Sequence, residues 1–230
     1  MVKIKLIPFL LFLLLLLFSH NGFFQFDKPI YSGLTISVMP LSLIDYTPRF
    51  RVGVERLPVR KIGYGIDVGF GKSWLNGWRL SGGDWGNDYS FYEIRPELKY
   101  VVKRDDRYFL YCGTELLYLL MTDRLEDNCY QKGYSGNAIS YDRARFQKQK
   151  YGIHLKAGVS HRLFEHFNVD IYGGAGVAER VIEYSEVVNP VEGDGDIFVE
   201  WLPQNHLFEG KTVLFHLTMG FRVGYIISCR

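Results

Sequence analysis

The stretch Ile62–Gly71, IGYGIDVGFG, decides the fold. Its residues alternate between large apolar side chains and glycine, with Asp67 as the one charged residue. Because successive side chains of a β-strand point to opposite faces, this stretch predicts a strand with one apolar surface and one nearly bare surface. A water-soluble sheet also shows such a pattern, so the rest of the chain has to separate the two possibilities.

The alternation recurs along the chain, and charged residues occupy the non-apolar face. From Phe91 to Val102, for example, apolar residues alternate with glutamate, arginine and lysine. We predict eight strands, the first being the weakest because Pro40 interrupts it. The predicted strands are Leu34–Leu43, Arg49–Leu57, Ile62–Gly71, Phe91–Val102, Tyr108–Met121, Lys148–Ser160, Asn168–Ala178 and Val213–Ile226.

The connections between these strands alternate in length. Pro58–Lys61, Lys103–Arg107 and His161–His166 are short. The long ones are Leu75–Asp88, Thr122–Arg145 and Glu183–Lys211. An even number of antiparallel strands with short periplasmic turns and long outer loops is typical of bacterial transmembrane barrels. The predicted fold class is all-β, an eight-stranded antiparallel transmembrane β-barrel over residues 34–227.

The N-terminal segment predicts export. Lys3 and Lys5 precede the apolar run Leu6–Phe18, which would span only about 20 Å as a helix, against about 30 Å of bilayer hydrocarbon. A charged start, a short apolar run and then small or polar residues are typical of a secretory signal peptide. We assign residues 1–22 to it, with cleavage between Ser19 and Gln25, and expect the mature protein in the bacterial outer membrane.

The charged residues of the non-apolar faces predict a structural network in the barrel lumen. An eight-stranded barrel is filled by its own side chains, and a buried unpaired charge is costly, so these residues are expected to pair. Six acidic and six basic residues are predicted there: Arg51, Glu55, Asp67, Glu93, Arg95, Glu97, Lys99, Glu115, Lys150, Lys156, Asp170 and Arg222. Aromatic residues near strand ends are expected at the membrane interfaces: Trp74, Trp78, Tyr89, Tyr100 and Tyr108.

Several phrases resemble the small outer-membrane barrels of the OmpA/OmpX type. They are PRFRVGVE (Pro48–Glu55), IGYGIDVGFG (Ile62–Gly71), IRPELKY (Ile94–Tyr100) and MGFRVGY (Met219–Tyr225). The resemblance covers the chain from about Leu34 and implies the barrel without the peptidoglycan-binding domain of full OmpA-like proteins. It also implies, as partners, outer-membrane lipid and lipopolysaccharide, the barrel-assembly machinery, and an extracellular ligand at the loops.

Composition and motifs bear on other classes of function. The net charge of +2, with basic and acidic residues evenly mixed, gives no basic patch, so we expect no nucleic-acid partner. Cys112, Cys129 and Cys229 are widely spaced and are expected to be isolated. Ser160 beside His161 is the nearest approach to a nucleophile and base, but adjacent strand residues point to opposite faces. We therefore predict no enzyme: no catalytic residues, no cofactor and no metal site.

Three functions remain open at this stage. The leading prediction is a structural or surface-interaction barrel with a side-chain-filled lumen and long extracellular loops. The first alternative is an enzyme that modifies lipid A, and the second is a narrow channel. A soluble barrel that carries its apolar residues inward is a further alternative.

Overall fold

The computed structural model describes residues 33–45, 47–56, 61–78, 88–133, 137–164, 166–193 and 208–228. The predicted signal peptide, residues 1–22, lies outside these residues, and so do Cys229 and the acidic positions Asp194, Asp196 and Glu200. Within the described part, no helix is both long and apolar enough to cross a membrane.

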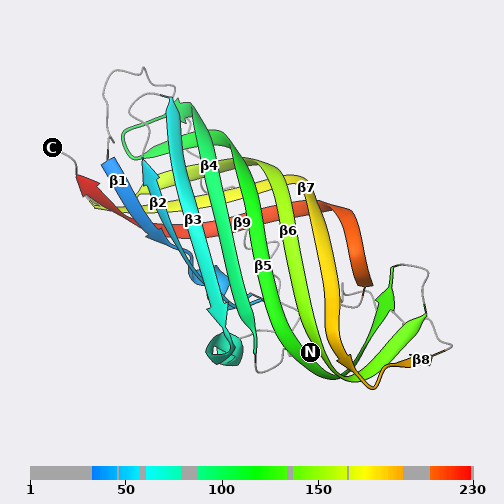
Figure 1. The fold of residues 1–230 in the computed structure, drawn as a ribbon. Helices are drawn as coiled ribbons and strands as arrows, with labels where there is room; N and C mark the ends of the chain where they lie inside the picture. The colour runs from blue at the N-terminus through cyan, green and yellow to red at the C-terminus, as the bar shows by residue number, and fades with distance from the viewer. Residues whose placement is uncertain are drawn as a thin grey trace, which may run out of the picture.

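Eight strands of a nine-stranded sheet form a ring that closes on itself (Figure 1). The neighbours around the ring are β1, β2, β3, β4, β5, β6, β7 and β9, and β9 pairs back to β1; every pair in the ring is antiparallel. The bounds are β1 Gly33–Val38, β2 Phe50–Arg56, β3 Ile62–Lys72, β4 Ser90–Arg104, β5 Tyr108–Lys132, β6 Ala138–Arg162, β7 Phe167–Val188 and β9 Phe208–Ser228. The prediction of an all-β chain with eight strands in this order is confirmed.

The first predicted strand is too long. β1 ends at Val38, and Pro40–Leu43 instead form the short 3-10 helix η1, with proline in its first turn. Proline lacks the N–H that a sheet needs but suits the first turn of a helix, which explains the change at this position. A second 3-10 helix, η2, covers Ser73–Trp78 after β3.

Two predicted loops are largely strand. The interval Thr122–Arg145 was expected as an outer loop, but β5 and β6 continue through it as a hairpin. Likewise β7 runs on to Val188, and a further strand β8, Val191–Gly193, pairs with the start of β6. The connections at the other end of the ring are short as predicted, for example residues 105–107 between β4 and β5.

The extended strands turn back toward the ring (Figure 1). Asp127, Glu186 and Asn189 have left-handed backbone φ angles of 46°, 51° and 51°, and the β6–β7 register shifts between Arg143 and Arg145. Such irregularities bend strands and increase their twist. The far end of β5, Gln131–Lys132, consequently pairs in parallel with the first residues of β9. We call residues 123–145 and 183–193 the outer lobe.

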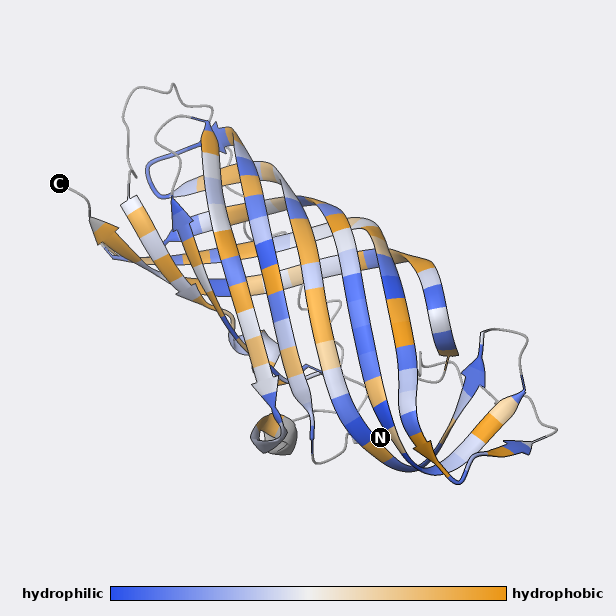
Figure 2. Ribbon diagram, viewed as in Figure 1, coloured by the Kyte–Doolittle hydropathy of each residue, from blue (hydrophilic) through white to orange (hydrophobic). Residues whose placement is uncertain are grey.

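Hydrophobic and hydrophilic residues alternate along the strands of the ring (Figure 2). On β3 the odd residues from Gly63 to Gly71 point inward, and the even residues from Ile62 to Phe70 are exposed outward. The inward glycines leave room for larger neighbours, since a Cβ on Gly69 would lie 2.6 Å from the Cγ of Glu93. The bare face seen in the sequence is therefore the space into which the charged side chains of β4 fit.

Candidate functional site: the charged interior and the outer lobe

The interior of the ring has three layers. At the end with the short turns lies a small apolar cluster of Val101, Phe109, Tyr111, Tyr172 and Ile226. At the opposite end a larger apolar cluster, which includes Phe91, Met121 and Phe146, continues into the outer lobe. The charged residues fill the middle. This order places the ions between two apolar layers, where pairing is required.

Arg222 on β9 is the hub of the network near the short-turn end. Its Nη2 donates to Asp67 Oδ2 at 2.8 Å and to Glu97 Oε2 at 2.7 Å, and its Nη1 donates to Asp170 Oδ2 at 3.2 Å. Lys99 Nζ lies 2.9 Å from the same Asp170 oxygen and 2.7 Å from Glu55 Oε2. One guanidinium thus holds carboxylates from three different strands.

A second group of ion pairs lies toward the outer end. Glu93 accepts hydrogen bonds from Arg49 Nε at 2.9 Å, from Arg51 Nη1 at 3.5 Å and from Arg95 Nε at 3.1 Å. Arg95 also reaches Glu115 at 2.9 Å, which joins this group to the rest of the network. Arg49 was absent from the predicted set, although it lies in the predicted strand Arg49–Leu57 with the same parity as Arg51.

The predicted lumen set is placed as follows. All twelve residues sit on strands of the ring, and eleven of them take part in ion pairs, Lys156 through Glu97 at 3.0 Å and Glu115 at 2.8 Å. Lys150 is the exception: it faces the interior, yet no carboxylate among the described residues lies within ion-pair distance of it. The balanced count of six acids and six bases therefore does not translate into complete pairing.

A histidine pair was missed by the sequence reading. His154 is fully buried on β6; its Nδ1 lies 3.2 Å from Glu115 Oε1, and its Nε2 lies 2.6 Å from His216 Nδ1 on β9. The two residues are 62 positions apart in the sequence. The only sequence signal for their contact is that each occupies an inward-facing position of its strand. Their hydrogen bonds extend the network across β7, whose Gly176 stands opposite both of them.

The other motifs weighed for chemistry do not assemble. Ser160 Oγ accepts a hydrogen bond from Asn168 Nδ2 at 3.2 Å, and His161 follows it on the other face of β6. Cys112 and Cys129 are free thiols. Across the described ranges, no group of three histidine, cysteine or acidic side chains is arranged to hold a metal ion.

The outward face of the ring is a continuous apolar surface. Side chains such as Leu98, Leu155 and Phe215 expose 55%, 70% and 73% of their area. Tyr100 is exposed there, and Trp74 is exposed on η2. Tyr89 was expected with them but is buried inside, where its hydroxyl donates to the Pro48 carbonyl oxygen at 3.2 Å.

The outer lobe has an aromatic core of its own. The rings of Tyr130 and Tyr184 stack with centroids 4.3 Å apart, and Tyr141 and Phe146 pack against Tyr184 at 6.0 and 5.6 Å. Burial raises the pKa of Tyr141 and of Tyr184 above the ordinary value, so both phenols stay neutral. Such aromatic pairs stabilise the bent hairpin by about 0.5–1.5 kcal/mol each beyond the area they bury.

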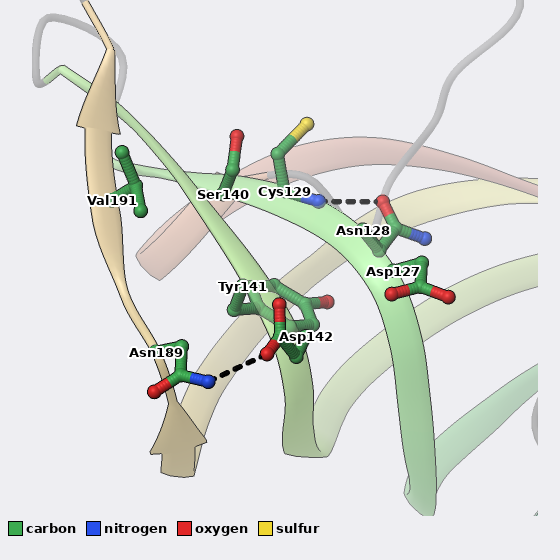
Figure 3. A pocket seen from close by; sticks show the side chains of 8 residues that line it. All are labelled: Asp127, Asn128, Cys129, Ser140, Tyr141, Asp142, Asn189 and Val191. Carbon is green, nitrogen blue, oxygen red and sulfur yellow. Dashed lines mark hydrogen bonds between the residues drawn. The ribbon is translucent and has the colours of Figure 1, made fainter.

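A pocket of about 410 Å³ opens on the lobe beside the bend (Figure 3). Asp127 from β5 and Asp142 from β6 line it together with Asn189, whose Nδ2 donates to Asp142 Oδ2 at 2.7 Å. The lining offers carboxylate and amide oxygens on an accessible surface, which suits hydrogen bonding to a polar partner.

No protein-family model matches this sequence, and no curated protein matches it either.

Proposed function

We propose that this chain is an outer-membrane β-barrel protein with a structural or surface-interaction role. The observation that carries the proposal is the closed eight-stranded sheet with an apolar outside and an ion-paired inside. A lipid bilayer is the environment in which such an apolar outer surface is stable, and closure of the ring satisfies the backbone hydrogen-bonding groups of every strand.

The exposed apolar area argues against an aqueous surrounding. Soluble monomers rarely expose contiguous apolar patches of more than a few hundred Å². Here the outward residues of neighbouring strands are apolar row after row, as in Val68, Ile94 and Tyr118. The soluble alternative requires apolar side chains inside and charges outside, which is the reverse arrangement.

Aromatic residues flank the aliphatic part of the outward face. Near the outer end Phe70 stands opposite both Phe50 and Tyr92, and Tyr118 stands opposite Tyr151. Near the short-turn end the cross-strand pair of Phe167 and Tyr225 lies in ring contact, with centroids 5.4 Å apart. Aromatic rows at both ends of an apolar band are typical of outer-membrane barrels.

The filled interior favours a structural role over conduction. Lys99, Glu115 and Arg222 each bind partners from other strands across the ring, and apolar clusters lie above and below them. The outer lobe, which lies beyond the proposed membrane span, supports a role in surface contact, because its ordered hairpin and pocket offer a fixed shape to a partner. Lipid, lipopolysaccharide and an extracellular ligand are the proposed partners.

The decisive experiment is expression of the full chain, leader included, in a Gram-negative host followed by fractionation. We expect the protein in the outer-membrane fraction, soluble only in detergent, and migrating differently on gels before and after boiling. A matched variant that lacks residues 1–22 is expected to remain in the cytoplasm. Recovery of the full chain from the aqueous periplasmic fraction would refute the proposal.

A further inference from the structure

Toward the outer end of the interior lie two lysines that have no ion-pair partner among the described residues. Lys148 and Lys150 occupy alternate positions on β6 and therefore share its inward face. Each stands opposite buried residues on both neighbouring strands: Lys148 opposite Met121 and Ile182, and Lys150 opposite Leu119 and Arg180. Both lysines are half-buried.

Carboxylates near this group, Glu93, Asp45 and the buried Asp123, already have partners of their own. Among the described residues, no carboxylate lies within ion-pair distance of either lysine. Glu93 is surrounded by Arg49, Arg51 and Arg95, and Asp45 binds Arg49 at 2.6 Å. Arg49 and Arg180 in turn add repulsion, since their positive charges act on both lysines.

This arrangement is unfavourable unless an anion joins it. Like charges directly opposite each other on neighbouring strands are destabilising, and Lys150 and Arg180 form such a pair. The apolar neighbours Leu119, Met121 and Ile182 lower the local dielectric, which strengthens the repulsion. An oxyanion that bridges the two lysines would relieve this repulsion.

We propose that Lys148 and Lys150, with Arg180 opposite, form a binding site for a phosphate group. Residues two apart on one strand face are separated by about 7 Å, so a group with several charged oxygens can accept hydrogen bonds from both ammonium groups. The phosphate is either free or the headgroup of a lipid, whose acyl chain would meet the adjacent apolar side chains. The site rests on the interior geometry and not on the proposed membrane location.

Binding is to be measured with the full mature chain folded in maltoside micelles, which contain no phosphate. The two probes are inorganic phosphate at constant ionic strength against chloride, and lysophosphatidic acid mixed into the micelles. The variants are Lys148→Gln and Lys150→Gln, with Lys61→Gln, exposed beyond the opposite end, as the matched control. Isothermal titration gives the affinity, and circular dichroism verifies the fold of each variant.

We expect the wild type and Lys61→Gln to bind equally and each interior variant to bind about tenfold more weakly, as befits one lost charged hydrogen bond. Binding of inorganic phosphate alone identifies a free anion as sufficient, and binding of only the lipid identifies a headgroup; both outcomes support the site. Equal affinity in all four proteins, or no binding of either probe, overturns it.

A second readout does not depend on affinity. Without phosphate, Lys150→Gln should unfold at the same or a higher temperature than the wild type, because an unpaired cation opposite Arg180 has been removed. With phosphate, the wild type and the Lys61→Gln control should gain more stability than either interior variant. If Lys150→Gln lowers the unfolding temperature in phosphate-free buffer, the lysine is stabilising without an anion and the proposal fails.

Discussion

Replacing Arg222 by methionine tests whether ion pairing holds the interior together. The guanidinium binds Asp67, Glu97 and Asp170 at 2.7–3.2 Å, and all four side chains are almost fully buried. Removing one partner of a buried ion pair costs about 3–5 kcal/mol, because an uncompensated charge stays behind. Glu97 and Asp170 keep lysine partners at 3.0 and 2.9 Å, so the main loss falls on Asp67.

The assignment to Asp67 is testable with a double-mutant cycle. In the Arg222→Met background, Asp67→Asn removes the stranded charge and should recover about 1–3 kcal/mol, whereas alone it should destabilise. The free energy of unfolding is to be measured by urea titration of the protein folded in micelles, followed by circular dichroism, with equal slopes in all four proteins. A loss below about 1 kcal/mol for Arg222→Met, or additivity within about 0.5 kcal/mol, would refute the reasoning.

Three further predictions concern the other layers. Gly69→Ala should destabilise the protein by about 1–3 kcal/mol, because the added Cβ meets Glu93. At Gly173 an added Cβ has no heavy atom within 4 Å, so Gly173→Ala should change the stability toward urea by less than about 0.5 kcal/mol. Equal effects of the two substitutions would contradict the close packing at Gly69. Leu98→Arg on the outward face should cost about 2–4 kcal/mol in lipid vesicles, and no cost there would argue against a lipid-facing site. The pKa of Tyr141 is raised above 10.0 in the fold, so its neutral phenol contributes to the free energy of unfolding below pH 10, and this contribution is lost as the pH rises toward the folded pKa. A tyrosinate absorbance titration should therefore show delayed ionisation of Tyr141, and urea should abolish the delay.

The strands of the ring are predictable because their signal is local. In Ile62–Gly71 each apolar residue turned out to be outward and each glycine inward, since a strand in contact with two different surroundings must alternate. The inward charges follow from the same parity. The ion-pair partners of these charges cannot be predicted from the alternation, because Arg222 and Asp67 lie 155 residues apart and meet only when the ring closes in one register.

The outer lobe escaped prediction for a different reason. Beyond Thr122 neither face of β5 alternates regularly, and the inward parity shifts between Leu125 and Tyr130 around the left-handed Asp127. A strand that leaves the ring no longer has one uniformly apolar face, so its sequence resembles a loop. The aromatic core that orders it comes from three separate strands and has no signature within any one of them.

The extension of the strands also changes which charged residues lie inside the ring. Arg180 lies just beyond the predicted end of its strand at Ala178, so the additional length of β7 brings it inward, and the additional length of β5 does the same for the acid Asp123. Lys148 and Lys150 already lay inside their predicted strand. Register then fixes which charges can meet, and the inner acids are used by Arg222, Lys99 and Lys156. Toward the outer end, Lys148 and Lys150 are therefore left without an ion-pair partner among the described residues, although the acids Glu93 and Asp123 are buried toward the same end. Pairing holds the middle of the ring together, while the outer end keeps the positive charge that an incoming anion would neutralise.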